Sequence, residues 1–180
     1  MARSVVVLYV IKVQLSIELV SLILSFPYIS IVFFSMLCVT QRSIGIIFCS
    51  LVYLFESMIY VFYAVPNFMI QGGDISNGKG GESIYGGFFE DESFEVKYNT
   101  VYLLSMANRG YRNTNGSQFF INTVKTSWLD KKHAAIGVVL KGKNIVDEIG
   151  TLGRRNGKPK EVVTIHNSGE LKPKKDSVKK

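Results

Sequence analysis

The stretch that decides the fold is Asn113-Thr-Asn-Gly-Ser-Gln-Phe-Phe-Ile-Asn122, in which an Asn/Gly-rich turn leads directly into an apolar run. Turn residues followed by a short apolar run favour a β-strand that is entered from a tight loop. The same pattern recurs along the rest of the domain. Counting this stretch, the apolar runs lie at 68–71, 101–106, 118–122, 134–139 and 162–165. The turns lie at 72–74, 77–81, 113–116 and 156–159. Short strands separated by such turns predict a mainly β domain, an antiparallel barrel or sandwich.

One helix is expected beside these strands, near residues 143–152. Ile145, Ile149 and Leu152 recur there at the i, i+4, i+7 spacing that places them on one helix face. Gly153 follows and is a suitable residue to end the helix.

Residues 1–65 have a different composition. Of the 21 Lys and Arg residues only Arg3, Lys12 and Arg42 lie there, so most of the net charge of +7 belongs to the remainder of the chain. The stretch from Leu19 to Gln41 carries no charge, and about 20 apolar residues suffice to cross a bilayer as a helix. A second apolar stretch, Ser43 to Val65, contains Glu56, which is costly at the centre of a membrane.

Two interpretations of residues 1–65 stay open at this point. They are one or two apolar, possibly transmembrane helices that anchor the protein to a membrane through residues 19–65, or they are non-native coding sequence. Both cysteines, Cys38 and Cys49, fall in this segment, and one pair in an apolar stretch is more typical of buried thiols than of a disulfide framework or a metal site. The sequence thus divides into 1–65, a polar domain at 66–171 and a basic tail at 172–180.

The tail from Lys172 to Lys180 reads Lys-Pro-Lys-Lys-Asp-Ser-Val-Lys-Lys. With almost no apolar content it is expected to be disordered. It is either a solvated end or a weak contact site for nucleic acid or an acidic protein.

Other chemistries are not indicated. The glycine-rich stretch 77–83 lacks the spacing of a phosphate-binding loop. His133 and His166 are far apart, with no cysteine near them, so no metal site is predicted. No serine lies in a nucleophile-elbow pattern. The sequence predicts neither a hydrolase nor an enzyme that needs a cofactor.

Five linked blocks of residues nevertheless form a pattern that resembles the cyclophilins, in order and nearly in spacing. They are Phe68-Met-Ile-Gln-Gly-Gly-Asp, Gly80-Gly-Glu-Ser-Ile-Tyr-Gly, Leu104-Ser-Met-Ala-Asn, Asn113-Thr-Asn-Gly-Ser-Gln-Phe-Phe-Ile and Trp128-Leu-Asp-Lys-Lys-His, followed by Ser168-Gly-Glu-Leu. Residues 86–94 and 107–110 are most similar to the larger nuclear, splicing-associated members. The resemblance implies a peptidyl-prolyl cis-trans isomerase with an eight-stranded antiparallel barrel and a flanking helix.

The resemblance also implies a site. Phe68, Met69, Phe120 and Leu129 would line a proline pocket, while Gln71 and the Asn108 backbone hold the substrate chain. Trp128 and His133 would lie on the rim. Gln71, Asn108, Phe120 and His133 are the expected catalytic residues, and the expected substrate-binding residues are Phe68, Met69, Ala107, Gln118, Trp128 and Leu129. The partners implied are proline-containing peptides and cyclosporin-type ligands.

Four departures from the family pattern limit what the resemblance implies. The family's phenylalanine-histidine-arginine element aligns with Val61-Phe62-Tyr63, so the arginine that donates to the prolyl nitrogen is replaced by Tyr63. The first two strands and the first helix of the family have no counterpart in 1–60, which predicts an incomplete barrel that is N-terminally truncated or replaced. One extra residue lies in the loop 109–114, and Ile136 replaces the family's usual phenylalanine.

The sequence therefore predicts a peptidyl-prolyl isomerase whose activity is impaired by Tyr63. The alternative is a non-catalytic cyclophilin-like module that binds proline-containing segments or cyclosporin-type ligands. The compartment stays open, a membrane if residues 1–65 are genuine and otherwise the cytoplasm or nucleus.

Overall fold

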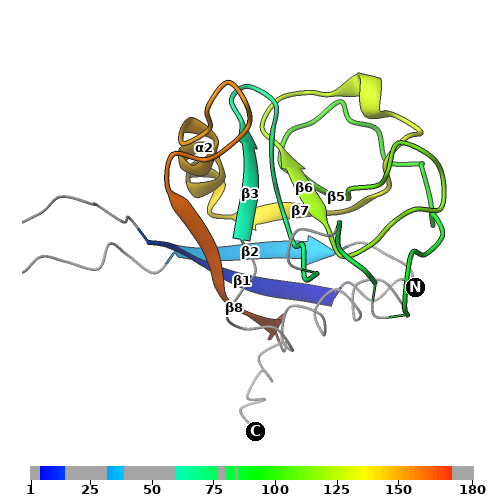
Figure 1. The fold of residues 1–180 in the computed structure, drawn as a ribbon, viewed down its shortest axis with the longest axis horizontal. Coiled ribbons are helices and arrows are strands. Elements are labelled where there is room, and N and C mark those ends of the chain that lie inside the picture. Colours follow the sequence, from blue (N-terminus) through cyan, green and yellow to red (C-terminus); the bar gives the residue numbers. More distant parts are fainter. Residues whose placement is uncertain (1–4, 15–31, 39–59, 77–79, 84, 172–180) are drawn as a thin grey trace, which may run out of the picture.

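The architecture is taken from a computed structural model that describes residues 5–14, 32–38, 60–76, 80–83 and 85–171. Side chains are described for residues 60–76, 80–83 and 85–165. The strands are β1 (Val5–Gln14), β2 (Val32–Cys38), β3 (Tyr60–Val65), β4 (Met69–Gly72), β5 (Leu103–Met106), β6 (Phe119–Asn122), β7 (Ala135–Lys141) and β8 (Val162–Leu171). They form a closed antiparallel barrel in the order β1-β2-β7-β5-β6-β4-β3-β8 (Figure 1).

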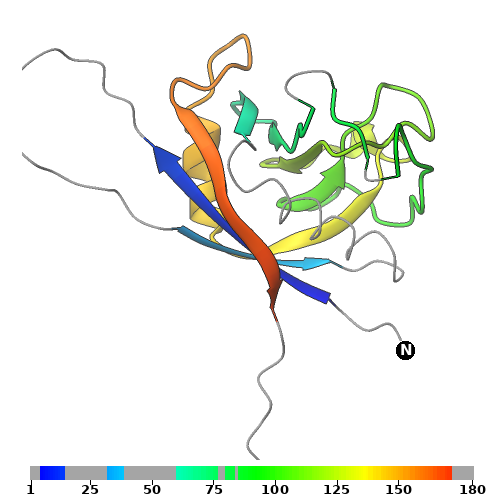
Figure 2. The same ribbon diagram turned by 60° about the horizontal axis from the view of Figure 1, so that its bottom comes forward.

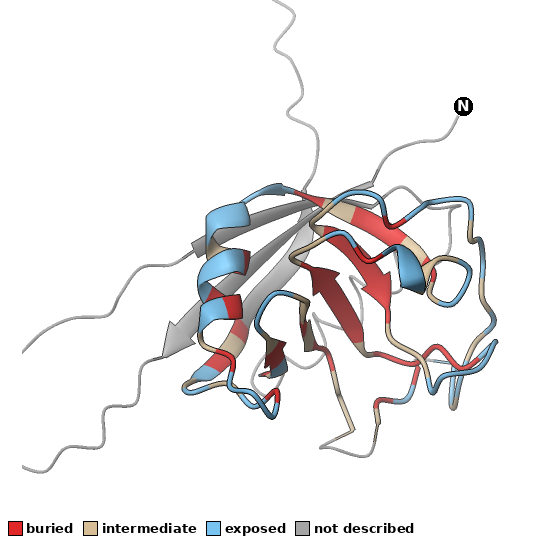
Figure 3. Ribbon diagram, turned by 90° about the horizontal axis from the view of Figure 1, so that it is seen from above, coloured by how far each residue is buried: buried red, intermediate tan, exposed pale blue. Residues whose placement is uncertain are grey.

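The strands and the helix expected from residue 66 onward are confirmed within one or two residues at most ends. Helix α2 (Lys143–Thr151) begins after Gly142 and ends next to Gly153. Ile149 is fully buried, and Ile145 and Leu152 pack against the same core, as the helical spacing predicted. The helix packs against β3 and β4 (Figure 1), and its outer face is exposed (Figure 3).

The prediction of an incomplete barrel is wrong, because residues 5–14 and 32–38 supply two of its strands. β1 pairs with β2 and β8, and β2 also pairs with β7, so the barrel has no open edge there (Figure 2). Val5–Gln14 is rich in valine and isoleucine, which suit a strand. Closing the sheet satisfies backbone groups that an edge would leave unpaired.

The expected apolar helices before the domain are not found in the described residues. Val32–Cys38 lies inside the first candidate span, 19–41, and Tyr60–Val65 lies inside the second, 43–65, yet both are strands. Among the described residues no helix combines the length and the apolar character that crossing a bilayer would require. The remaining residues of both spans, and the tail at 172–180, lie outside the described part of the chain. The length of an apolar run was the wrong criterion for predicting a helix here, because apolar runs rich in β-branched and aromatic residues form strands as readily as helices.

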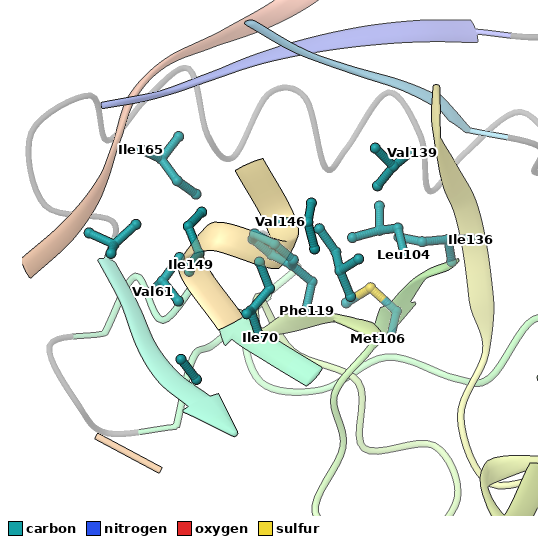
Figure 4. Close-up of a cluster of buried hydrophobic side chains, with 13 residues drawn as sticks. Val61, Ile70, Leu104, Met106, Phe119, Ile136, Val139, Val146, Ile149 and Ile165 are labelled. Atoms are coloured by element: carbon teal, nitrogen blue, oxygen red, sulfur yellow. The ribbon is translucent and has the colours of Figure 1, made fainter. Parts of the chain in front are cut away.

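The main core lies inside the barrel. Thirteen buried hydrophobic residues from the strands and α2 form it, among them Ile70, Leu104, Ile121 and Ile149 (Figure 4). Ile136 is one of these buried residues and only 1% exposed.

A tight turn between β3 and β4 sets the register that positions the site. Asn67 has a φ of 57°, a left-handed conformation that Asn tolerates better than most residues. The Phe68 N–H donates to the Val65 carbonyl at 3.1 Å. As a result Tyr63 lies opposite Gln71, and Ala64 opposite Ile70.

Candidate functional site

The register divides the sheet into an inner and an outer row. Ala64, Ile70, Ile121 and Leu104 lie opposite one another on β3, β4, β6 and β5 and belong to the core inside the barrel. The residues one position away in each strand form the second row, namely Tyr63, Gln71, Phe120, Ser105 and Ala135. Directly opposite residues share a face of the sheet, so this outer row, as we name it, points away from the core.

A second apolar cluster is built around Phe120 in the outer row. Phe120 is 4% exposed, and Tyr98 and Leu103 are buried with it. Met69, Ala107 and Leu129 pack against them but are only partly buried. We call these six residues the Phe120 cluster; Ala135 and Val138 also contact it. An apolar floor with a partly exposed edge is the kind of surface that binds a small apolar ring.

Two rings hold the Phe120 side chain in place. The Tyr98 ring stacks on it with centroids 6.2 Å apart, and the His133 ring meets it edge to face at 5.3 Å. Burial raises the pKa of Tyr98 to about 12, so its hydroxyl stays protonated, and this hydroxyl donates to the His133 carbonyl at 3.3 Å. The floor of the cluster is therefore fixed on both sides.

His133 is held as a neutral ring. Its Nδ1 lies 3.1 Å from the Met106 carbonyl, and because a carbonyl oxygen only accepts, Nδ1 must carry the proton. Burial lowers the pKa of His133 and outweighs that hydrogen bond, which acts in the opposite direction. Nε2 is left with a lone pair as an acceptor.

Trp128 and Phe68 form an aromatic pair with ring centroids 5.9 Å apart. Trp128 belongs to the short 3-10 helix Ser127–Leu129 and is 55% exposed, whereas Phe68 is partly buried at the start of β4. The same 3-10 turn carries Leu129 of the Phe120 cluster. Trp128, the predicted rim residue, is thus exposed, whereas Phe68, which was predicted to line the pocket, is partly buried.

A relay of amides runs beside the cluster from Asp74 to Gln71. Gln118 Nε2 donates to Asp74 Oδ2 at 3.1 Å, and Gln71 Nε2 donates to Gln118 Oε1 at 2.8 Å. An ionised carboxylate can only accept hydrogen bonds, so the amide NH₂ group of Gln118 must face Asp74. The amide oxygen of Gln118 then faces Gln71 and accepts from the Gln71 NH₂ group. The carbonyl oxygen of Gln71 is thereby left to accept from a bound chain.

Asp74 is kept ionised by the turn that follows it. Burial alone would raise its pKa, but hydrogen bonds from the Ser76 hydroxyl and N–H, the Gly80 N–H and Gln118 together outweigh burial and lower the pKa. The Ser76 N–H and hydroxyl each lie 2.8 Å from Oδ1, and the Gly80 N–H lies 3.0 Å from Oδ2.

Asn108 uses its side chain to hold its own loop. Its Nδ2 donates to the Lys132 carbonyl at 2.7 Å, and its Oδ1 accepts from the Gly110 N–H at 3.0 Å. Its backbone is the part left for a bound chain, and that role stays a prediction. Neighbouring Ala107 donates its N–H to the Gln118 carbonyl at 3.0 Å, which connects this loop to β6.

Tyr63 lies at one end of the outer row, opposite Gln71. It is 45% exposed, and its ring meets that of Phe62 edge to face at 5.4 Å. A Cβ on Gly157 would lie 2.5 Å from its Cδ1, so the tyrosine ring covers that glycine closely. The neutral hydroxyl is a donor of shorter reach than a guanidinium.

The ten predicted site residues thus lie together around the outer row. Their contacts with a substrate stay predictions. Two residues that support the site were not predicted. Asp74 stands in a quoted block but had no assigned role, and Tyr98 is a lone aromatic residue among exposed ones with no sequence signal to mark it.

The sequence also matches the model of a known protein family. Residues 40–170 match a family model described as "Cyclophilin type peptidyl-prolyl cis-trans isomerase/CLD". The match covers more than half of the chain, begins ahead of the blocks that carry the resemblance, and includes all of the site residues named above. The chain therefore belongs to the cyclophilin-type peptidyl-prolyl cis-trans isomerase family.

Proposed function

We propose that the chain binds proline-containing segments on the Phe120 cluster and isomerises their X–Pro bonds at a rate limited by Tyr63. The observation that supports this most is the outer row, which places an apolar floor (Phe120), an oriented amide (Gln71) and a polar end group (Tyr63) on consecutive strands.

The reaction needs no nucleophile and no proton transfer. Amide resonance sets a barrier of about 18–20 kcal/mol, and the site lowers it by binding the twisted amide better than the planar one. In the proposed complex the proline ring rests on Phe120, Met69 and Leu129. Gln71 and the Asn108 backbone hold the chain on either side, so that rotation is confined to the X–Pro bond.

Tyr63 is the reason to expect a slow enzyme. As the amide loses conjugation, the prolyl nitrogen becomes a better acceptor, and the family's arginine donates to it. Loss of one preorganised donor costs on the order of 3 kcal/mol of barrier lowering, which corresponds to about a hundredfold in rate.

The test is to restore the arginine. We expect Tyr63→Arg to raise the isomerisation rate of a short X–Pro peptide about a hundredfold, measured by protease-coupled assay with the full-length chain. Tyr60→Arg is the matched control, because Tyr60 lies on the same strand and is similarly exposed (42% against 45%). A gain in both variants, or in neither, would contradict the proposed role of position 63.

The second candidate is a binding module with negligible turnover. It is favoured by the close packing of the Tyr63 ring on Gly157, which leaves less space for a longer side chain at that position. Saturable cyclosporin binding by the wild-type chain, together with no rate gain in Tyr63→Arg, would select this candidate.

A narrower assignment within the family rests on two loops. Residues 86–94 and 107–110 resemble the nuclear, splicing-associated cyclophilins, and the Arg109 guanidinium lies 4.4 Å from the Phe88 ring centroid, which joins the two loops. We infer that the chain belongs to this subgroup. Nuclear localisation of a tagged full-length chain is expected, and exclusion from the nucleus would count against it.

A further inference from the structure

A hairpin next to Tyr63 carries an unusual density of positive charge. Residues 153–160, between α2 and β8, read Gly-Arg-Arg-Asn-Gly-Lys-Pro-Lys. We call this segment the basic hairpin. Arg154, Arg155, Lys158 and Lys160 are all exposed, and the segment contains no carboxylate. Figure 1 shows it as the orange loop beside β3.

The hairpin is held in one conformation by its own backbone. The Lys160 N–H donates to the Leu152 carbonyl at 2.8 Å, the Arg154 N–H to the Lys158 carbonyl at 3.0 Å, and the Gly157 N–H to the Arg154 carbonyl at 2.8 Å. Gly157 has a φ of 82°, which permits the turn. Charges on a preorganised backbone cost less to order on binding than charges on a free loop.

The same hairpin is attached to the strand that carries Tyr63. The Ala64 N–H donates to the Gly157 carbonyl at 2.8 Å, and the Tyr63 ring covers Gly157. Gly153 lies directly against the Ala64 carbonyl and Pro66, where a side chain would clash. The hairpin is therefore fixed to the Tyr63 end of the outer row.

The charges of the hairpin are largely free to bind something else. Within the described part of the chain, the side chains of Arg154, Arg155 and Lys158 take part in no hydrogen bond or ion pair, and Lys160 Nζ makes one long contact of 3.4 Å with the Thr151 carbonyl. The preceding helix offers Asp147, whose carboxylate already accepts from the Tyr102 hydroxyl at 2.8 Å, and Glu148.

The distance from the proline site to the hairpin matches a few residues of extended chain. β6, which carries Phe120, and β3, which carries Tyr63, are separated by one strand. Two strand spacings of about 4.8 Å make about 10 Å, and an extended residue spans at most about 3.6 Å. A side chain roughly two to four residues from the bound proline can therefore reach the hairpin.

We propose that the basic hairpin is a specificity site that binds an acidic residue of the substrate two to four positions from the proline. This inference rests on the proposed function, because the proline must occupy the Phe120 cluster for the flanking residues to pass over the hairpin. An acidic peptide is favoured over nucleic acid because the hairpin itself carries no aromatic side chain on which a base could stack.

The test compares fluorescent peptides of one length with the full-length chain by anisotropy. Three contain a single proline and carry either neutral flanks, two glutamates before the proline or two glutamates after it. A fourth repeats the better acidic peptide with its proline replaced by alanine. At low salt we expect one acidic peptide to bind about fivefold to tenfold more tightly than the neutral one, in the range of one or two partly screened ion pairs. The preference should shrink as salt is raised.

Two double variants with equal changes in net charge localise the effect. Arg154→Glu with Arg155→Glu should abolish the preference and leave the affinity for the neutral peptide unchanged. Lys97→Glu with Lys125→Glu, at exposed lysines outside the hairpin, should keep the preference. Circular dichroism of each variant shows whether the fold is retained.

Three outcomes would overturn the inference. One is neutral and acidic peptides that bind equally. Another is a preference that both double variants lose alike. The third is a proline-free acidic peptide, or a single-stranded oligonucleotide, that binds as tightly as the proline peptide and depends on the hairpin in the same way, since the hairpin would then be a general anion site. Failure of the neutral and acidic proline peptides alike would overturn the proposed function as well, so the two failures are distinguishable.

Discussion

Strands β4 to β7 and strands β1 to β3 close one barrel, but their sequences differ in how well they match the family. β4, β5 and β6 overlap the sequence blocks that resemble the cyclophilins. They carry Met69, Leu103 and Phe120 of the Phe120 cluster. β1 and β2 lie in an apolar segment with no such block, and β3 carries Tyr63 at one end of the outer row. The comparison shows that strands with and without such blocks close the same barrel.

A barrel strand needs only a pattern that pairs with its neighbours, and many apolar sequences supply one. A binding site needs particular side chains on particular strands. We therefore expect the site to resemble that of the family most from β4 onward and least at its β3 end. Each prediction below tests whether these two regions differ in this way.

The largest effect is expected from removing the first region altogether. The fragment 66–180 lacks β1, β2 and β3, so β8 loses both of its partners, β4 and β7 each lose one, and the barrel opens. We expect it to be marginally stable, while the full-length chain unfolds cooperatively in a calorimetric or circular dichroism melt. A cooperative melt of the fragment above about 50 °C, within the usual mesophile range, would show that β1 to β3 are dispensable.

The second prediction concerns the Phe120 cluster. Phe120→Ala should lower the free energy of unfolding by about 3–5 kcal/mol, because it leaves a cavity between Tyr98 and His133. Denaturant unfolding followed by circular dichroism measures it. Trp128→Ala serves as the control, since the exposed rim residue should cost less than about 1 kcal/mol. Equal losses in the two variants would mean that Phe120 is not the floor of the site.

The third prediction distinguishes the contribution of the amide relay to peptide binding from that of the neighbouring turn. Asp74→Asn removes the obligate acceptor that orients Gln118 and Gln71, and we expect about tenfold weaker binding of an X–Pro peptide, equivalent to about 1.4 kcal/mol. Ser76→Ala removes a hydrogen bond to the same carboxylate but leaves the relay intact, so it should bind nearly as the wild type. If the two variants bind alike, the relay has no role in positioning Gln71.

The smallest effect is a pH dependence from His133. Burial lowers its folded pKa below the ordinary value of 6.5, so the unfolded chain binds the proton more readily than the folded one. The stabilising contribution is fully present above about pH 6.5 and is lost as the pH falls from there toward the folded pKa. The free energy of unfolding should decline over this range, and His133→Gln should flatten the decline. A decline of the same size in His133→Gln would assign it to other groups.

From Pro66 onward the sequence was sufficient to predict most of the fold. Short apolar runs with Gly/Asn turns predicted β4 to β8, and the spacing of Ile145, Ile149 and Leu152 predicted α2. The site residues followed from ordered family blocks, because side chains that bind a substrate must recur at fixed positions.

The remainder was not predictable for physical reasons. Residues 5–14 and 32–38 form strands through pairing with β7 and β8, a long-range effect that local hydrophobicity does not reveal. Tyr98 contributes to the site only because the loop that carries it folds back onto Phe120. The orientation of Gln71 depends on Asp74 through Gln118, and no local pattern shows such a relay.

The central claim is that a cyclophilin-type binding site assembles with Tyr63 at its β3 end, and the fluorescence of Trp128 tests this claim most directly. Trp128 is the single tryptophan and lies on the rim beside Phe68. Its fluorescence can therefore be followed while cyclosporin is titrated into the full-length protein. We predict a saturable change in emission that competes with an X–Pro peptide. Unchanged emission from protein that unfolds cooperatively would contradict the claim.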